Sequence, residues 1–247
     1  ERGIFRTTDG GDNWQKVHVT NYGRQNPGGG THFAFASATT IYAGNHSGNI
    51  LKSTNSGTTW STITTIGTYI YDIKIDPVDN TILYVASNTG FKKMVDSGGI
   101  TVTALGAGLP AYPYVFVINP SNRDIMYASA WSSGIYKSTD RGVNFSAVNN
   151  GLSGAIATGA GAKHLSISPA DPNYLYVYFR NPAGGTYWGK FYYSHNAGAN
   201  WYLPTSIDTQ NADGWVNGSY IRDGEGFAAG SAAPIAMHPN NRDIAIT

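Results

Sequence analysis

Three carboxylic acids near the end of the 247-residue chain are the side chains best suited to chemistry. Asp213, Asp223 and Glu225 share one segment that is rich in glycine and polar residues. Hydrolysis of a glycosidic bond uses two carboxyl groups that face each other across the bond, one as the acid and the other as the base or nucleophile. We therefore take these three acids as the candidate catalytic residues.

Aromatic side chains accompany the acids on segments of the same polar kind. Rings stack on the apolar faces of sugars, while amides, carboxylates and guanidinium groups bind the hydroxyls. The predicted substrate-binding residues are Trp131, Tyr187, Trp188, Trp215, Tyr220 and Arg222. In an alternative interpretation, Trp188 and Trp215 only pin their own long loops. That alternative stays open.

Composition argues against several other kinds of function. The chain has no cysteine, so disulfides, thiolate catalysis and Cys-ligated zinc are excluded. His32 and His46 are both expected in loops. They have no spacing that forces them together, and we expect neither a metal site nor a cofactor. A net charge of +1, with no basic run longer than Lys92-Lys93, argues against a nucleic-acid partner. The longest apolar run, at residues 114–118, is too short to span a membrane.

An eight-residue pattern recurs and predicts how these side chains are positioned. The copies read TTDGGDNW (7–14), STNSGTTW (53–60), STDRGVNF (138–145) and SHNAGANW (194–201), with a worn copy MVDSGGIT at 94–101. In each copy the Asp or Asn can accept bonds from nearby backbone N–H groups, Ser or Thr can assist, and Gly can adopt a positive φ. The pattern therefore predicts a tight turn with a structural role.

A second pattern precedes most copies. It reads IKIDPVDNTILYVA (73–86), FVINPSNRDIMYAS (116–129), LSISPADPNYLYVY (165–178) and IAMHPNNRDIAIT (235–247). Each copy alternates apolar and polar residues on both sides of a proline-containing turn, as two antiparallel strands do. Together the two patterns give four strands per repeat, and we expect the fourth strand to begin at the aromatic residue of the eight-residue pattern. They predict an all-β fold, a β-propeller of four-stranded antiparallel blades with about five blades visible.

We expect residues 1–247 to form a single propeller region. The predicted blade repeats are roughly 1–20 with 234–247, 31–65, 68–105, 112–149 and 162–205. The chain begins in a third strand and stops after a second. The two halves could therefore close a five-bladed ring, or the chain could be part of a larger propeller. We favour a fragment of a longer protein.

The eight-residue pattern resembles the Asp-box, or bacterial neuraminidase repeat, S/T-x-D/N-x-G-x-x-W/F. The phrases NNGLSG (149–154) and GAGLP (106–110) look closer to the xyloglucanase family of glycoside hydrolases and to sortilin-like propellers than to sialidases. The resemblance implies the fold, whereas function depends on the loops opposite the repeated turns. The xyloglucanase family places catalytic Asp residues in second-to-third-strand loops, in phrases like T-D-I-G-G. The corresponding loops GNHSGN, SNTG, AWSSG and RNPAGGTYWGK contain no acid.

Sialidases are a further enzyme class among Asp-box propellers. They bind the substrate carboxylate with three arginines, and Arg24, Arg180 and Arg222 lie on the expected loop face. The arginine-isoleucine-proline type of motif found near a sialidase's first blade has no match in this chain. We therefore disfavour a sialidase.

These observations predict a glycan-recognising propeller, secreted, extracellular or on the cell surface of a bacterium. By resemblance its parent is a xyloglucanase-like glycoside hydrolase acting on plant-type β-glucans, with an oligo- or polysaccharide as partner. The alternative is a non-catalytic, sortilin-like module that binds protein or peptide. Whether the chain is an enzyme stays open at this point.

Overall fold

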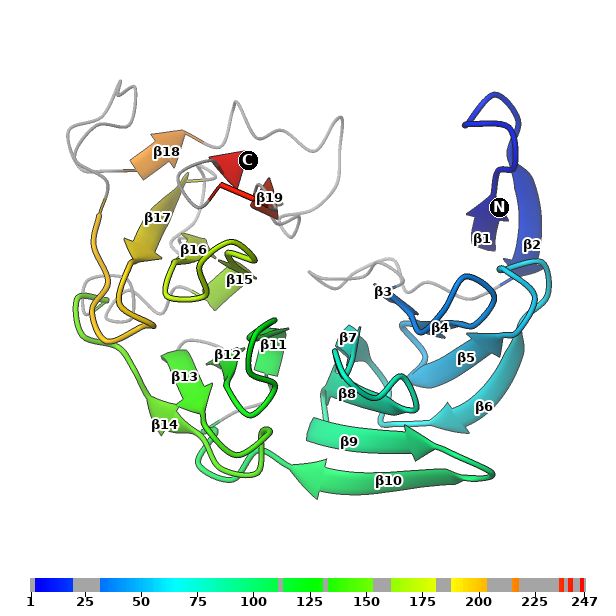
Figure 1. Cartoon of the computed structure of the whole chain (residues 1–247), viewed down its shortest axis with the longest axis horizontal. Helices are drawn as coiled ribbons and strands as arrows, with labels where there is room; N and C mark the ends of the chain where they lie inside the picture. The colour runs from blue at the N-terminus through cyan, green and yellow to red at the C-terminus, as the bar shows by residue number, and fades with distance from the viewer. Residues whose placement is uncertain are drawn as a thin grey trace. The chain divides into compact units, whose positions relative to one another are not determined.

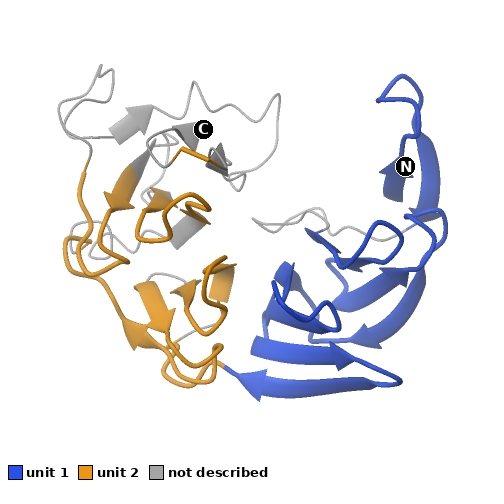
Figure 2. Ribbon diagram, in the orientation of Figure 1, with its two compact units in different colours: residues 1–105 blue, residues 106–247 orange. Residues whose placement is uncertain are grey.

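The computed structural model describes residues 3–19, 32–110, 113–130, 133–152, 161–180, 188–203, 215–217, 236–237, 240–241 and 245–246. At 161–163, 180, 188–190, 215–217, 236–237 and 245–246 only the backbone is described. The chain forms two compact units, residues 1–105 and 106–247 (Figure 2).

Unit 1 contains one two-stranded and two four-stranded antiparallel sheets, in which strands consecutive in sequence pair (Figure 1). Its strands are β1 (Gly3–Arg6), β2 (Gln15–Val19), β3 (His32–Phe35), β4 (Ile41–Gly44), β5 (Asn49–Ser53), β6 (Ser61–Thr65), β7 (Ile70–Ile75), β8 (Ile82–Ser87), β9 (Gly90–Asp96) and β10 (Ile100–Leu105). The sheets are β1–β2, β3–β6 and β7–β10. Side chains between neighbouring sheets form the core, with Ile50 and Leu83 buried in one cluster and Ile4 and Leu51 in another.

Unit 2 repeats this organisation with two four-stranded sheets and one two-stranded sheet. Its strands are β11 (Pro113–Ile118), β12 (Met126–Ala130), β13 (Gly134–Ser138), β14 (Ser146–Ala147), β15 (Gly161–Ile167), β16 (Leu175–Arg180), β17 (Trp188–Ser194), β18 (Trp215–Asn217), β19 (Ala236–Met237) and β20 (Ala245–Ile246). The sheets are β11–β14, β15–β18 and β19–β20. Tyr127, Ile135, Leu165 and Trp201 belong to the core between the two four-stranded sheets.

The predicted fold class is confirmed. Every regular element in the described part of the chain is a strand, and the four-stranded sheets are antiparallel meanders. One detail was wrong: the fourth strand was expected to begin at the aromatic residue of the pattern. In three sheets it begins one residue later, at Gln15, Ser61 and Ser146. The aromatic residue closes the turn before the strand starts.

The eight-residue turns have nearly the same hydrogen bonds in four copies. In sheet β3–β6 the Ser53 hydroxyl accepts from the backbone N–H of Gly57 at 2.9 Å and donates to Asn55 Oδ1 at 3.0 Å. Asn55 Oδ1 also accepts from the backbone N–H of Thr59 at 2.9 Å. The corresponding bonds recur in the copies that begin at Thr7, Ser138 and Ser194.

Two consecutive residues with positive φ bend three of these turns. Ser56, Arg141 and Ala197 have φ values of 56°, 60° and 54°, and each is followed by the glycine of the pattern with φ near 80°. Glycine adopts this conformation without steric cost, whereas a non-glycine residue is held there by the surrounding bonds. The pattern is thus explained as a structural turn, as its sequence predicts.

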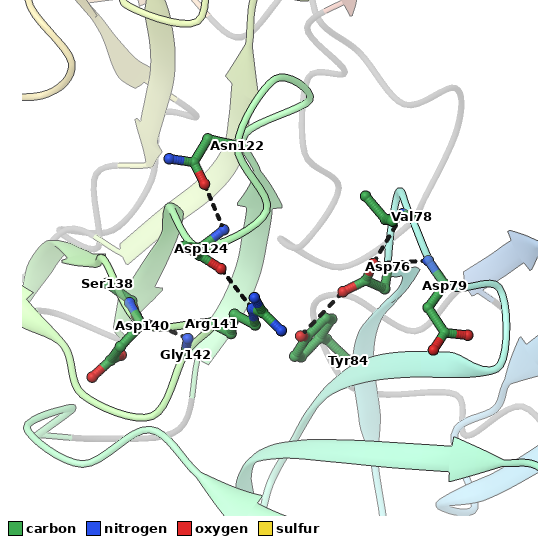
Figure 3. Close-up of polar contacts among 10 residues, drawn as sticks. All are labelled: Asp76, Val78, Asp79, Tyr84, Asn122, Asp124, Ser138, Asp140, Arg141 and Gly142. Carbon is green, nitrogen blue, oxygen red and sulfur yellow. Dashed lines mark hydrogen bonds and ion pairs between the residues drawn. The ribbon is translucent and has the colours of Figure 1, made fainter.

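The first-to-second-strand turns are held by a side chain next to proline. The carboxylate of Asp76 accepts from the backbone N–H groups of Val78 and Asp79 at 2.9 and 3.0 Å (Figure 3). Asn119 makes the same two bonds at the equivalent turn of unit 2, to residues 121 and 122. Figure 3 also shows the exposed contact between Arg141 and Asp124, 2.5 Å long.

A basic residue directly before the eight-residue turn fastens its sheet to the turn of the next sheet in the same unit. We call these contacts clasps. Their bonds run from Arg6 Nε to the Ser56 carbonyl (2.8 Å), from Lys52 Nζ to Asp96 Oδ2 (2.6 Å) and from Lys137 Nζ to the Ala197 carbonyl (3.3 Å). In the last two clasps a tyrosine hydroxyl joins the same acceptor residue, with Tyr42 donating to Asp96 and Tyr127 donating to the Ala197 carbonyl. Burial raises the pKa of Tyr127 to about 12.

Candidate ligand-binding site

Each four-stranded sheet has two different ends because its strands form a meander. The turn end contains the first-to-second-strand turn and the eight-residue turn. The loop end contains the second-to-third-strand connection and the connection to the next sheet. The turn ends repeat the same structural bonds from sheet to sheet. Residues that differ between sheets, and with them a specific binding site, are therefore expected at a loop end.

Three short segments lock together at the loop end of unit 1. They are residues 45–48 between β4 and β5, residues 66–69 between β6 and β7, and residues 88–89 between β8 and β9. Asn88 Oδ1 accepts from the backbone N–H groups of Thr68 and Tyr69 at 2.9 and 3.1 Å, and its Nδ2 donates to the Thr68 hydroxyl at 2.7 Å. The Gly48 carbonyl accepts from the Ile66 N–H at 2.7 Å. This end of unit 1 is therefore a well-bonded platform.

An aromatic pair lies on this platform. The rings of His46 and Tyr69 have centroids 4.4 Å apart and are tilted by 58°. Both side chains are half-buried, and burial lowers the pKa of His46 below its ordinary value. The imidazole is therefore neutral at pH 7 and offers a ring face together with one hydrogen-bond donor and one acceptor.

An ionic group lies toward the same loop end, on β7, which follows residues 66–69, and on β3. Asp72 on β7 is buried and pairs with Lys74, whose Nζ is 3.1 Å from Asp72 Oδ2. His32 on the neighbouring strand β3 has its Nδ1 3.9 Å from Asp72 Oδ1. The side chains of His32 and Lys74 keep 32% and 35% of their surface exposed, so this buried carboxylate carries two accessible donors.

The combined arrangement suits a ligand with many hydroxyl groups. His46 and Tyr69 supply ring surface, and Thr68 and Thr89 on the same three segments are exposed. His32 and Lys74 supply polar donors. Among the described residues, Asp72 is the only carboxylate toward a loop end, because the other described acids belong to turn ends. The described residues therefore support binding more directly than they support two-carboxylate hydrolysis.

Most of the predicted site residues lie outside the described part of the chain. These residues are Trp131, Tyr187, Asp213, Tyr220, Arg222, Asp223 and Glu225. Their predicted roles stay predictions.

Trp188 and Trp215 were expected in long loops, and this placement was wrong. Trp188 begins β17 and Trp215 begins β18, and these two strands pair. The register places Trp188 opposite Asn217 and Lys190 opposite Trp215. This pairing was hidden from the sequence because strand three and strand four are normally joined by the short eight-residue turn. The structure thus brings these two predicted positions onto adjacent strands of one sheet.

Sequence reasoning missed Asp72, Lys74, Tyr69 and Asn88 because it searched only the long, variable loops. A signal for two of them was present: Asp72 and Lys74 alternate with apolar residues in the strand IYDIKI (70–75). Charged residues at alternate strand positions share one face of the sheet. Tyr69 and Asn88 sit in connections too short to stand out by length. His46 does lie in its predicted loop, whereas His32 lies in β3.

Two kinds of feature are absent from the described residues. No set of three or more His, Cys, Asp or Glu side chains there is arranged to hold a metal ion. No described helix is long and apolar enough to cross a bilayer.

No protein-family model matches the sequence, and no curated protein matches it either. Solved structures do resemble it. An ancestral GH74 enzyme is similar with a TM-score of 0.62 and 19% identity over 82% of this chain and 28% of its own. The GH74 xyloglucanase from Xanthomonas campestris is similar with a TM-score of 0.58 and 18% identity over 79% of this chain and 32% of its own. This chain thus spans about a third of those enzymes.

A further propeller is also similar. YCF48, solved bound to D1 peptide, has a TM-score of 0.55 and 14% identity over 84% of this chain and 62% of its own. At these identities the likenesses show the fold alone. The chain has the β-propeller fold, built from four-stranded antiparallel blades.

Proposed function

We propose that the chain belongs to a secreted or cell-surface propeller that recognises a glycan, in the manner of a xyloglucanase-like protein acting on plant-type β-glucans. The observation that carries this proposal is the His46–Tyr69 ring pair beside the Asp72–Lys74 ion pair at one loop end. Rings and hydroxyl-binding groups held on a bonded platform suit the alternating apolar and polar surface of a sugar chain. The structural likeness to GH74 enzymes supports the same ligand class.

Trp188 and Trp215 extend the proposal to unit 2. Their positions on adjacent paired strands are compatible with a common role in stacking on sugars. Trp131, Tyr187, Tyr220 and Arg222 stay in the proposal as predicted partners of the same glycan.

A more specific part of the proposal is that the protein hydrolyses the glycan. It requires two carboxyl groups about 5 to 9.5 Å apart on opposite sides of the scissile bond. We assign this task to two of the predicted acids, Asp213, Asp223 and Glu225. Asp223→Asn and Glu225→Gln should then abolish the release of reducing ends from xyloglucan, while affinity for the polymer stays within about threefold of wild type.

Peptide recognition is the second candidate. The observation that favours it is the likeness to YCF48, a propeller solved with a bound peptide, of which this chain spans 62%. The alternating donors and rings of a loop end could also bind an extended peptide. This candidate needs no catalytic carboxylates.

The test compares glycan and peptide ligands on one folded protein. Xyloglucan oligosaccharides, cellohexaose and an array of ten-residue peptides are titrated against wild type, Tyr69→Ala and the control Tyr136→Ala. Tyr136 is a half-buried tyrosine on β13 in unit 2 and does not belong to the loop-end site. Loss of one stacking ring costs about 1 kcal/mol, so Tyr69→Ala should weaken glycan binding about fivefold while Tyr136→Ala does not.

The outcomes separate the two candidates. Glycan binding that weakens only in Tyr69→Ala supports the main proposal. Peptide binding without glycan binding replaces it with the second candidate. Native circular dichroism together with no response to any glycan refutes glycan recognition.

A further inference from the structure

The residue directly before the eight-residue turn departs from its pattern in one sheet only. It is basic in four copies, at Arg6, Lys52, Lys93 and Lys137, but it is Tyr193 in the sheet β15–β18. Registers confirm the equivalence, because Lys52, Lys137 and Tyr193 each pair with the residue just after the pattern's aromatic: Ser61, Ser146 and Tyr202. The sheet β15–β18 thus lacks the cation that forms clasps elsewhere.

At two further positions of the eight-residue pattern and its flank, this sheet also has an aromatic ring where the other sheets have a different residue type. Where the sheets β3–β6 and β11–β14 have Thr54 and Thr139, this sheet has His195. Where they have Ser61 and Ser146, it has Tyr202. Small hydroxyl residues are replaced by rings at positions that the repeat does not require to be aromatic.

The three rings form one group, which we call the rim cluster. His195 and Tyr202 are stacked, with centroids 4.9 Å apart and planes within 8°. Tyr193 lies 5.6 Å from Tyr202 and 6.2 Å from His195. Tyr174 borders the cluster, with its centroid 6.4 Å from that of His195.

The rim cluster is open to solvent. Tyr202 is 38% exposed, His195 is also exposed, and Tyr193 is half-buried. The equivalent positions of unit 1, Thr54 and Ser61, are also exposed although the sheet β7–β10 packs beside theirs. A neighbouring sheet therefore leaves these positions uncovered. Burial in a core does not explain why they are aromatic in this sheet.

We propose that the rim cluster, Tyr193, His195 and Tyr202, binds a neutral oligosaccharide of pyranose sugars. Exposed ring faces stack on the C–H faces of such sugars, and the phenol hydroxyls and the imidazole bond to sugar hydroxyls. The cluster contains no Lys, Arg, Asp or Glu, so it matches an uncharged ligand better than an acidic one. It lies at the turn end of its sheet and is a second site, separate from the loop-end site of unit 1.

The test replaces two residues of the rim cluster with the residue types found at the equivalent positions of the other sheets. The variant His195→Thr/Tyr202→Ser has the residue types found at 139 and 146, and its matched control is Thr139→Ala/Ser146→Ala in the sheet β11–β14. Cellohexaose, xyloglucan heptasaccharide, laminarihexaose and maltohexaose are titrated by calorimetry against both variants and wild type. We expect the rim variant to lose about tenfold in affinity for at least one probe. Its thermal midpoint should stay within about 3 °C of wild type, because the altered side chains are at the surface.

The loop-end variant Tyr69→Ala separates this proposal from the function proposed above. If the rim variant binds all four probes as wild type does, the rim site is overturned, whatever Tyr69→Ala does. If the rim variant loses affinity and Tyr69→Ala does not, the rim site is supported and the loop-end site fails. Binding of a peptide ligand in place of all four sugars, abolished by the rim variant, overturns the sugar assignment.

Discussion

The turn ends of the sheets repeat the same contacts, whereas the loop end of unit 1 has contacts of its own. At the turn ends, the same side chains make nearly the same bonds in four copies of one pattern, as the hydroxyls of Ser53, Ser138 and Ser194 illustrate. At the loop end of unit 1, Asn88 bonds the connection at Thr68 and the ring pair His46–Tyr69 occurs once among the described residues. Repetition therefore marks the residues that build the blade, and departure from repetition marks candidates for recognition.

This contrast also applies within the turn ends. Lys52 and Lys137 use one position of the repeat to hold the neighbouring sheet, whereas Tyr193 at the same position joins an aromatic group at the surface. A repeat protein offers an internal control for such a comparison, because the fold already accepts the residue types found in its other sheets.

The largest expected effect comes from the pattern's aromatic position. Trp201 is 3% exposed in the core of unit 2 and donates from Nε1 to the Val148 carbonyl at 2.7 Å. Trp201→Ala removes this bond and leaves a large cavity, so it should lower the free energy of unfolding by about 3 to 5 kcal/mol. Urea unfolding followed by far-UV circular dichroism measures the change.

Trp14 is the matched control, since it fills the same pattern position but is 62% exposed. Its Nε1 donates within its own turn, to the Gly11 carbonyl. Trp14→Ala should cost about 1 kcal/mol or less. Equal losses for the two variants would show that the turn itself, and not packing against the neighbouring sheet, sets the energy of this position.

A smaller effect is expected at the loop end, from Gly48. Its φ is +74°, and a Cβ there would lie 2.2 Å from the Gly67 carbonyl oxygen. Gly48→Ala should therefore displace residues 66–69 and lower the free energy of unfolding by about 2 to 3 kcal/mol, from the left-handed backbone and the steric overlap together. Glycan affinity should fall in the same variant because Tyr69 moves with its segment.

Gly98 separates the two contributions, because it has the same φ of +74° but no atom within 4 Å of the place where the methyl group of an alanine would lie. Gly98→Ala should cost only the backbone contribution, about 1 kcal/mol. Thermal unfolding of both variants measures the difference. A loss in Gly98→Ala as large as that in Gly48→Ala would contradict the close packing of the loop-end segments.

The sequence predicts the scaffold well because the scaffold is local. An eight-residue turn determines its own bonds, and alternation of apolar residues determines the strands, so the copies at Ser53 and Ser138 could be recognised without neighbours. The candidate site depends on contacts between segments far apart in sequence. Asn88 bonds the backbone of Thr68, and Asp72 contacts His32, and no local sequence pattern predicts either contact.

The same reasoning explains why the sequence predicted Trp188 and Trp215 in loops. Trp188 and Trp215 lie on paired strands although residues 202–214, a stretch without the repeat pattern, separate the second of them from the last repeat copy. Pairing of this kind is decided by the register of the sheet, which local propensity does not determine. In the sequence, the rim cluster is visible only as a departure of one repeat copy from the others, as at Tyr193.

The smallest expected effect tests the clasp between sheets β3–β6 and β7–β10. Burial by itself would raise the pKa of Asp96, but hydrogen bonds from Lys52 and Tyr42, together with the Lys52 charge, outweigh it and hold this pKa below the ordinary value of 3.8. A carboxylate with a lowered pKa stabilises the fold fully above its unfolded pKa, and this contribution is lost as pH falls through the folded pKa. Asp96→Asn should therefore lower the free energy of unfolding by about 1 to 2 kcal/mol at pH 7. The gap to wild type should narrow below about pH 4.

Asp124→Asn is the control for this last prediction. Asp124 also bonds a basic side chain, that of Arg141, but the two side chains are 45% and 48% exposed, and solvent screens the pair. Its loss should cost about 0.5 kcal/mol or less and should vanish in about 1 M salt. Urea titrations from about pH 2.5 to 7 compare the two variants with wild type. If the cost of Asp96→Asn stays constant across that range, the clasp acts through the shape of the turn, and the charge of Asp96 contributes nothing to holding the sheets together.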